Sequence, residues 1–254
     1  MKRLLLFSLI IFLLSCGSNR NSSDQTLNIS ELPIGEFVKK SGRKLISQDN
    51  GFIKIVSDSI FNDSTIIIAV HGYQSEGYEW INALNDLSEN NSNIYFYRYD
   101  WDTCPDIVGK SLAKSIDSLL SSNPITSNIY IFGHSYGGLV VTYCANNLYN
   151  TINTEIHTIA SPLAGYPRFL ENCDFEYSDD NKLKYPKWTS NIEHYQWRTQ
   201  KEQDGAYLDL EYDPQEIVLN NSTVTILPDS MDGHRLGHNW SVTWVIKNIL
   251  DKQI

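Results

Sequence analysis

The chain has 254 residues, and its 30 acidic residues against 20 lysines and arginines give a formal net charge of −10 at pH 7. This acidic balance excludes a dedicated nucleic-acid-binding protein, which would display a basic face. Hydrophobic residues make up 41% of the chain and charged residues only 20%, so the chain can bury a substantial core and is not a disordered protein. We therefore expect one globular body.

The first fifteen residues have the pattern of an export signal. Lys2 and Arg3 precede an apolar run over residues 4–14, which is too short to span a bilayer. The run ends in the sequence LLSCG at residues 13–17, which resembles the signal of a bacterial lipoprotein. The resemblance implies that the signal is removed and that Cys16 carries a lipid, which would anchor the protein to a membrane on the periplasmic or surface face of the cell envelope. An acidic chain repels anionic headgroups, so the lipid would be the anchor.

Residues 16–31 are rich in serine and asparagine and predict a flexible tether before a domain over residues 32–254. The three other cysteines have no C-x-x-C spacing that would indicate zinc. Cys144 lies in an apolar stretch and fits a core position. Cys104 and Cys173 could pair in an exported protein, but the sequence leaves that pairing open.

Short apolar runs alternate with helical patterns along the rest of the chain. The strand-like runs cover residues 66–70, 94–97, 129–132, 156–160, 192–197 and 224–227. Helical spacing of apolar residues follows Pro105 and returns in a closing helix from Val242. The alternation predicts an α/β fold with a mostly parallel central sheet flanked by helices. Residues 165–190 break the rhythm and predict a small cap-like insertion over one end of the sheet.

Residues 133–137 read Gly-His-Ser-Tyr-Gly, directly after a predicted strand and directly before an apolar helical stretch. This is a G-x-S-x-G nucleophile elbow in the context that it requires. Its glycines leave room for a strained turn that presents the Ser135 hydroxyl, and the following helix offers its positive end to developing negative charge. From about residue 50 to the C-terminus, the chain resembles the lipase and esterase type of α/β-hydrolase.

Two further segments carry this resemblance. Residues 70–73, Val-His-Gly-Tyr, lie where such enzymes keep their oxyanion loop. The resemblance implies that the backbone N–H groups of Tyr73 and Tyr136 hold the oxyanion, and that His71 is structural. Residues 160–165 are similar to a strand end in bacterial lipases and in proteins resembling GPI inositol deacylases.

In this superfamily the base follows the last strand. His238 and His234 both satisfy that order, and His238 is preferred because its Gly-His-Asn context directly precedes the terminal helix. His157 and His194 lie inside strand patterns and are expected to be structural. His134 fills an unconstrained position within the elbow.

The acid should come between the nucleophile and the base in the chain. Asp204 follows the predicted strand at residues 192–197 and stands before Gly205, in a setting that resembles the acid turn of several lipases. Glu202 and Asp209 are the alternatives. Asp100 and Asp102 come too early for the usual order.

The resulting hypothesis is hydrolysis of a carboxylic ester, from a small molecule or a lipid, through an acyl-serine intermediate with no metal and no cofactor. An amidase, peptidase or thioesterase with the same triad is an alternative, as is a non-catalytic binding lipoprotein on the same scaffold. The aromatic residues of the insertion fit either an acyl pocket or the core of a cap. They are Phe169, Phe175, Tyr177, Tyr185 and Trp188.

Overall fold

The structure is a computed structural model that describes residues 25–58, 64–90, 93–149, 152–166 and 173–253. The predicted export signal, Cys16 and Phe169 lie outside the described residues. Within the described part, no helix is both long enough and apolar enough to cross a membrane.

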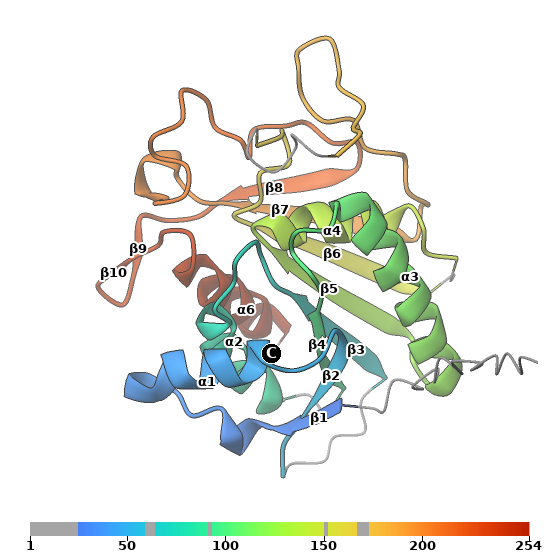
Figure 1. Ribbon diagram of the computed structural model, residues 1–254, viewed down its shortest axis with the longest axis vertical. Helices are drawn as coiled ribbons and strands as arrows, with labels where there is room; N and C mark the ends of the chain where they lie inside the picture. Colours follow the sequence, from blue (N-terminus) through green and yellow to red (C-terminus); the bar gives the residue numbers. More distant parts are fainter. Residues whose placement is uncertain (1–24, 59–63, 91–92, 150–151, 167–172, 254) are drawn as a thin grey trace, which may run out of the picture.

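An eight-stranded sheet forms the centre of the molecule, with the strand order β1-β2-β4-β3-β5-β6-β7-β8 (Figure 1). The strands are β1 (Gln25–Asn28), β2 (Gly51–Val56), β3 (Thr65–Val70), β4 (Ile94–Arg98), β5 (Asn128–His134), β6 (Asn153–Ile159), β7 (Ile192–Arg198) and β8 (Ser222–Ile226). Every neighbouring pair is parallel except β2 and β4. The predicted α/β class with a mostly parallel sheet is therefore confirmed.

Helices cover both faces of this sheet (Figure 1). One layer holds α1 (Val38–Ile46), α2 (Tyr78–Ser88) and α6 (Trp240–Gln253), and the other holds α3 (Pro105–Ser122) and α4 (Tyr136–Ala145). The short elements are the 3-10 helices η1 (Ile29–Glu31), η2 (Gly35–Phe37) and η3 (Lys201–Gln203) and the hairpin of β9 (Ser230–Met231) and β10 (His234–Arg235).

The two layers explain why the central strands are apolar at nearly every position. Alternate residues of β3 point to opposite faces: Ile66 and Ile68 join the core under α3 and α4, whereas Ile67 and Ala69 join the core under α2 and α6. A strand buried on both faces has no solvent side, so its sequence shows a continuous apolar run.

The N-terminal limit of the folded body differs from the prediction. Residues 25–31, which the sequence placed in the tether, form β1 and η1, and β1 pairs in parallel with β2 along its whole length. Only Leu27 of β1 is buried, so the strand depends on backbone hydrogen bonds that leave no apolar period in the sequence. The remaining tether, residues 16–24, lies outside the described residues.

The segment between β6 and β7 has little regular structure in its described part, where an isolated bridge joins Tyr177 and Leu183. A disulfide and the buried Leu183 side chain fix it to the body, and two hydrogen bonds fix it to the residues that follow β6. A disulfide joins Cys173 to Cys104 at the start of α3, and Leu183 N–H donates to the Ala164 carbonyl at 3.1 Å. The Tyr185 hydroxyl donates to the Leu163 carbonyl at 2.9 Å. Cys144 is a buried free thiol.

We expect the double substitution Cys104→Ser/Cys173→Ser to lower the free energy of unfolding by about 2–4 kcal/mol, because the disulfide closes a long loop and restricts the unfolded chain. Urea unfolding of both proteins under non-reducing conditions measures the difference. The single substitution Cys144→Ser serves for comparison, and equal stability of the wild type and the double variant would contradict the assignment.

Candidate active site

Ser135 lies in a sharp turn between β5 and α4. Its backbone angles are φ 53° and ψ −123°, in a region that non-glycine residues rarely adopt. The glycines on either side are required by close packing: a Cβ on Gly133 would lie 2.4 Å from the Gly137 carbonyl oxygen, and a Cβ on Gly137 would lie 2.4 Å from that of His71. The elbow is therefore formed in full, with its serine held at a strained corner.

The loop after β3 borders this corner. A Cβ on Gly72 would lie 2.9 Å from the Ser135 Cβ, so Gly72 packs directly against the serine and Tyr73 follows it. Tyr136 is the first residue of α4, where the helix dipole places partial positive charge. The rings of Tyr73 and Tyr136 lie 6.3 Å apart. The structure thus places both residues of the predicted oxyanion hole beside Ser135.

His238 and Asp204 are in direct contact. The His238 Nδ1 lies 3.0 Å from the Asp204 Oδ2, with the Asp204 side chain fully buried and the His238 side chain 18% exposed. Asp204 also accepts hydrogen bonds from the Thr199 hydroxyl at 2.5 Å and the Ala206 N–H at 2.9 Å. Burial by itself would raise the pKa of Asp204, but His238 and these two donors outweigh it, so the pKa is lowered and the carboxylate is ionised at neutral pH.

Two side chains connect this pair to the serine. The Tyr207 ring packs edge-to-face on the His238 ring at 5.1 Å, while its hydroxyl donates to the Ala160 carbonyl at 2.6 Å and interacts with the Ser135 side chain. His134 donates from Nε2 to the His238 carbonyl at 2.9 Å. Among the described residues, no direct hydrogen bond joins the Ser135 Oγ to His238.

The alternative acid and base residues lie elsewhere. His234 is exposed on β10 and stacks on Trp240 with ring centroids 4.7 Å apart. Glu202 and Asp209 are exposed on either side of Asp204 along the chain. Of the candidates from the sequence, the structure brings Asp204 and His238 together and leaves the other three in solvent.

The other buried histidines each make at least one hydrogen bond within the body, although the Nε2 of His194 has no partner. His71 donates from Nδ1 to the Gly72 carbonyl at 2.8 Å and accepts from the Tyr99 N–H at 3.3 Å, which orders the loop beside Ser135. His157 accepts from the Trp197 indole at 3.1 Å, and His194 bonds the Ser222 hydroxyl at 2.7 Å. These three histidines are structural, in agreement with the sequence analysis.

Sequence reasoning missed Tyr207, Thr199 and Gln215 and took His134 for an unconstrained position. Tyr207 belongs to the same turn as Asp204, because its N–H bonds the Asp204 carbonyl at 3.0 Å. The sequence Asp-Gly-Ala-Tyr at residues 204–207 has the spacing of one turn, and this spacing is the sequence signal that could have placed Tyr207 beside Asp204. Gln215 is distant in sequence, yet it accepts from the Thr199 N–H and donates to the Thr199 carbonyl, both at 3.0 Å.

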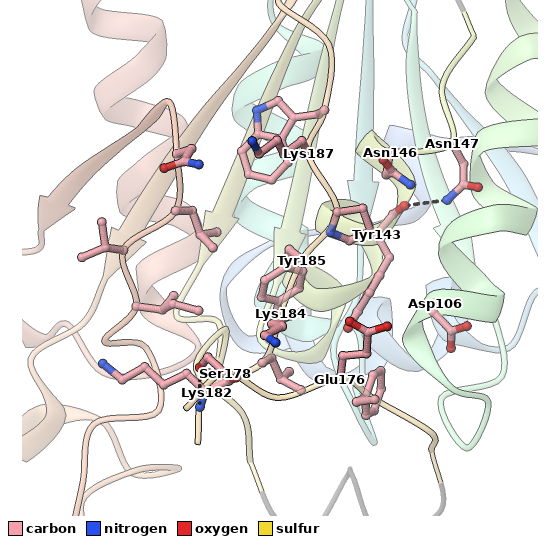
Figure 2. Close-up of a pocket in the computed structure, with 18 of the residues that line it drawn as sticks. Asp106, Tyr143, Asn146, Asn147, Glu176, Ser178, Lys182, Lys184, Tyr185 and Lys187 are labelled. Carbon is pink, nitrogen blue, oxygen red and sulfur yellow. Dashed lines mark hydrogen bonds between the residues drawn. The ribbon is translucent and has the colours of Figure 1, made fainter. Parts of the chain in front are cut away.

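A cavity of about 1180 Å³ lies between the insertion and the C-terminal end of α4 (Figure 2). Phe175, Tyr185 and Trp188 line it and also pack against the main core. These side chains therefore form both a cavity wall and part of the packed core, so they fit both alternatives from the sequence, a pocket and the core of a cap. Ser135 and His238 do not line this cavity. In the described part of the chain, no group of three or more histidine, cysteine, aspartate or glutamate side chains is arranged to hold a metal ion.

Comparison with solved structures finds similar folds at low sequence identity. The mature form of Bacillus licheniformis lipase BlEst2 is 12% identical, with a TM-score of 0.53 over 77% of this chain and 94% of the lipase. Its propeptide form is 11% identical, with a TM-score of 0.56 over 81% of this chain and 54% of that one. LpqC, a poly(3-hydroxybutyrate) depolymerase from Bordetella parapertussis, is 12% identical, with a TM-score of 0.51 over 78% of this chain and 82% of that one.

No family profile and no curated protein matches the sequence. The similar structures and the sheet topology together show that this chain has the α/β-hydrolase fold, as the resemblance in the sequence implied.

Buried histidines should make the stability of the fold sensitive to acid. Burial lowers the pKa of His71, His134 and His194 to about 3, and it lowers that of His157. An unfolded histidine has a pKa of about 6.5, so below that pH the unfolded state binds more protons and the free energy of unfolding falls as the pH is lowered.

Urea unfolding between pH 7 and pH 4 tests this expectation. Each such histidine contributes up to about 1.4 kcal/mol per pH unit. His194→Gln removes one of them and should reduce the slope of stability against pH. A variant with the slope of the wild type would show that His194 is not neutral in the folded state.

Proposed function

We propose that this protein is a serine hydrolase that cleaves a carboxylic ester, with Ser135 as nucleophile, His238 as general base and Asp204 as the acid that orients it. The observation that supports this most is the buried Asp204–His238 contact of 3.0 Å, joined through Tyr207 and His134 to a serine at a strained elbow. A serine hydroxyl is a weak nucleophile until a base accepts its proton, and the arrangement supplies that base.

In the proposed reaction the Ser135 Oγ attacks the ester carbonyl carbon while its proton passes to His238 Nε2. Asp204 accepts the Nδ1–H of the imidazole, which selects the tautomer with a free Nε2 lone pair and stabilises the imidazolium that forms. The N–H groups of Tyr73 and Tyr136 would receive the oxyanion. The imidazolium then protonates the leaving alcohol, and a water molecule, deprotonated by His238, releases the acid from the acyl-serine.

An ester is preferred to an amide because the solved structures of similar fold include a lipase and a poly(3-hydroxybutyrate) depolymerase. The same triad chemistry serves amidases, peptidases and thioesterases, so the bond cleaved is decided by assay. No step of this mechanism uses a metal or a cofactor, and the substrate is a small-molecule or lipid ester.

We further propose that the protein is an envelope lipoprotein anchored through Cys16. Support comes from the signal-like residues before Cys16 and from the described body, which begins at β1 soon after it. A short tether would hold the catalytic body close to the membrane face, with the lipid supplying the attachment.

We expect Ser135→Ala to abolish both labelling by a fluorophosphonate probe and turnover of a short soluble ester, because loss of a nucleophile costs on the order of 10⁶-fold in rate. His238→Ala should be almost as inactive, since members of a triad act as a unit. Asp204→Asn should lose on the order of 10⁴-fold, because an amide holds the imidazole in the wrong tautomer.

His234→Ala is the matched control for His238→Ala, because His234 is close to His238 in the chain but is exposed on β10 and does not contact Asp204. Its initial rates should stay within about twofold of the wild type, with thermal melts to exclude unfolding. An inactive His234 variant beside an active His238 variant would refute the assignment of the base. Stoichiometric labelling of Ser135→Ala would refute the nucleophile.

Cys16→Ala should move the protein from the membrane fraction to the soluble fraction, because the variant has no thiol to receive a lipid. Fractionation of cells that express each form measures the shift, and mass spectrometry of the mature N-terminus identifies the modification. An unmodified N-terminal peptide that starts upstream of Cys16 would contradict the proposal.

A further inference from the structure

The backbone carbonyl of His238 accepts hydrogen bonds from two side chains outside the proposed triad. The His134 Nε2 lies 2.9 Å from this oxygen, and the Ser241 Oγ lies 2.6 Å from it. His134 precedes the nucleophile in the chain, and Ser241 is in the first turn of α6. One oxygen atom of the base residue is therefore fixed from the elbow on one side and from a helix on the other.

Burial and the hydrogen-bond partner of His134 determine its protonation state and tautomer. Only 3% of the residue is exposed, and burial lowers its pKa to about 3, so the ring is neutral at neutral pH. A carbonyl can only accept, so the proton of the neutral ring must be on Nε2, and Nδ1 is a bare acceptor. The Nδ1 atom is buried and has no hydrogen-bond partner. His134 therefore keeps its one donated hydrogen bond to the His238 carbonyl although its other ring nitrogen is unpaired.

The contact also connects the nucleophile to the base. Ser135 and His134 share a peptide bond, and one hydrogen bond leads from His134 to the residue that carries the imidazole. The His134 and His238 rings lie 4.8 Å apart. Residues 232–235 are exposed in the β9–β10 hairpin, whereas Leu236 directly before Gly237 and His238 is buried, so the chain enters the body just before the base.

We propose that His134 and Ser241 are positioning residues that hold the His238 backbone, and so its imidazole, in register with Ser135. Asp204 orients the imidazole from the far side, at Nδ1, while His134 and Ser241 fix the point from which the side chain begins. This inference rests on the proposed function, because it takes Ser135 and His238 as the reacting pair.

Two substitutions at position 134 separate hydrogen bonding from packing. Gln carries an amide N–H that can reach the same carbonyl, whereas Phe keeps a planar ring and has no donor. His134→Phe should lower kcat on a soluble ester by about 10- to 100-fold with KM changed less than about threefold, because a displaced base weakens the transition state rather than substrate binding. His134→Gln should recover most of that loss.

The same two substitutions at His157 are the matched control. His157 is a buried histidine on the neighbouring strand β6, where it pairs in register with Phe132 and bonds Trp197 rather than His238. His157→Phe and His157→Gln should lower the melting temperature while kcat of the folded protein stays within about twofold of the wild type. A loss of kcat in these variants equal to that of His134→Phe would assign the effect to packing and overturn the proposal.

Ser241→Ala keeps the test decisive if His134→Phe does not fold. It removes the second donor to the same oxygen and should lower kcat by about three- to tenfold. An unchanged kcat in Ser241→Ala would overturn the proposal.

The labelling rate of Ser135 by the fluorophosphonate probe distinguishes a failure of the positioning role from a failure of the proposed hydrolase activity. A wild type that labels, with a His134→Phe variant that folds and labels at the same rate, would overturn the positioning role and leave the proposed hydrolase intact. A wild type that neither labels nor turns over esters would overturn both.

Discussion

The turn at Ser135 is the constraint on which the rest of the site depends. Its positive φ reverses the chain between β5 and α4 so tightly that helix and strands meet through backbone atoms, with Gly137 against the His71 carbonyl. A Cβ on Gly138 would lie 1.8 Å from the Ser161 Oγ, so α4 also sits directly on the chain that follows β6. Because the helix touches the ends of both neighbouring strands, Gly72 and Ala160 take fixed places around the serine. These close backbone contacts in turn hold Ser135 in its strained conformation.

Burial of a carboxylate organises the chain on the other side of the site. An ionised Asp204 in the interior is unfavourable unless donors surround it, and Thr199, Ala206 and His238 provide them. Gln215 in turn binds both backbone groups of Thr199. This network, together with the buried Tyr207, holds the irregular segment after β7 in place. It also explains why the acid has a lowered pKa although it is fully buried.

The insertion between β6 and β7 is held by contacts other than regular backbone pairing. It has little regular hydrogen bonding in its described part, so a disulfide to α3, two hydrogen bonds to residues 163 and 164 and the packing of Leu183 in the core hold it in place. Fixing this segment also fixes one wall of the cavity above α4 (Figure 2). A preformed wall lowers the entropic cost of any binding that takes place there.

Local sequence by itself determined the α/β class, six of the eight sheet strands and the serine at the elbow, because each depends on a period or spacing within a few residues. The edge strand β1 gave no such signal, since backbone pairing leaves little trace in side chains. The order of nucleophile, acid and base along the chain left a few candidates for the predicted acid and base. Only the tertiary structure brought Asp204 into contact with His238, which is 34 positions away in the sequence. The contacts of His134 and Tyr207 and the Cys104–Cys173 disulfide were likewise decided by the fold, because hydrogen bonds and disulfides between distant segments depend on distances that no local pattern encodes.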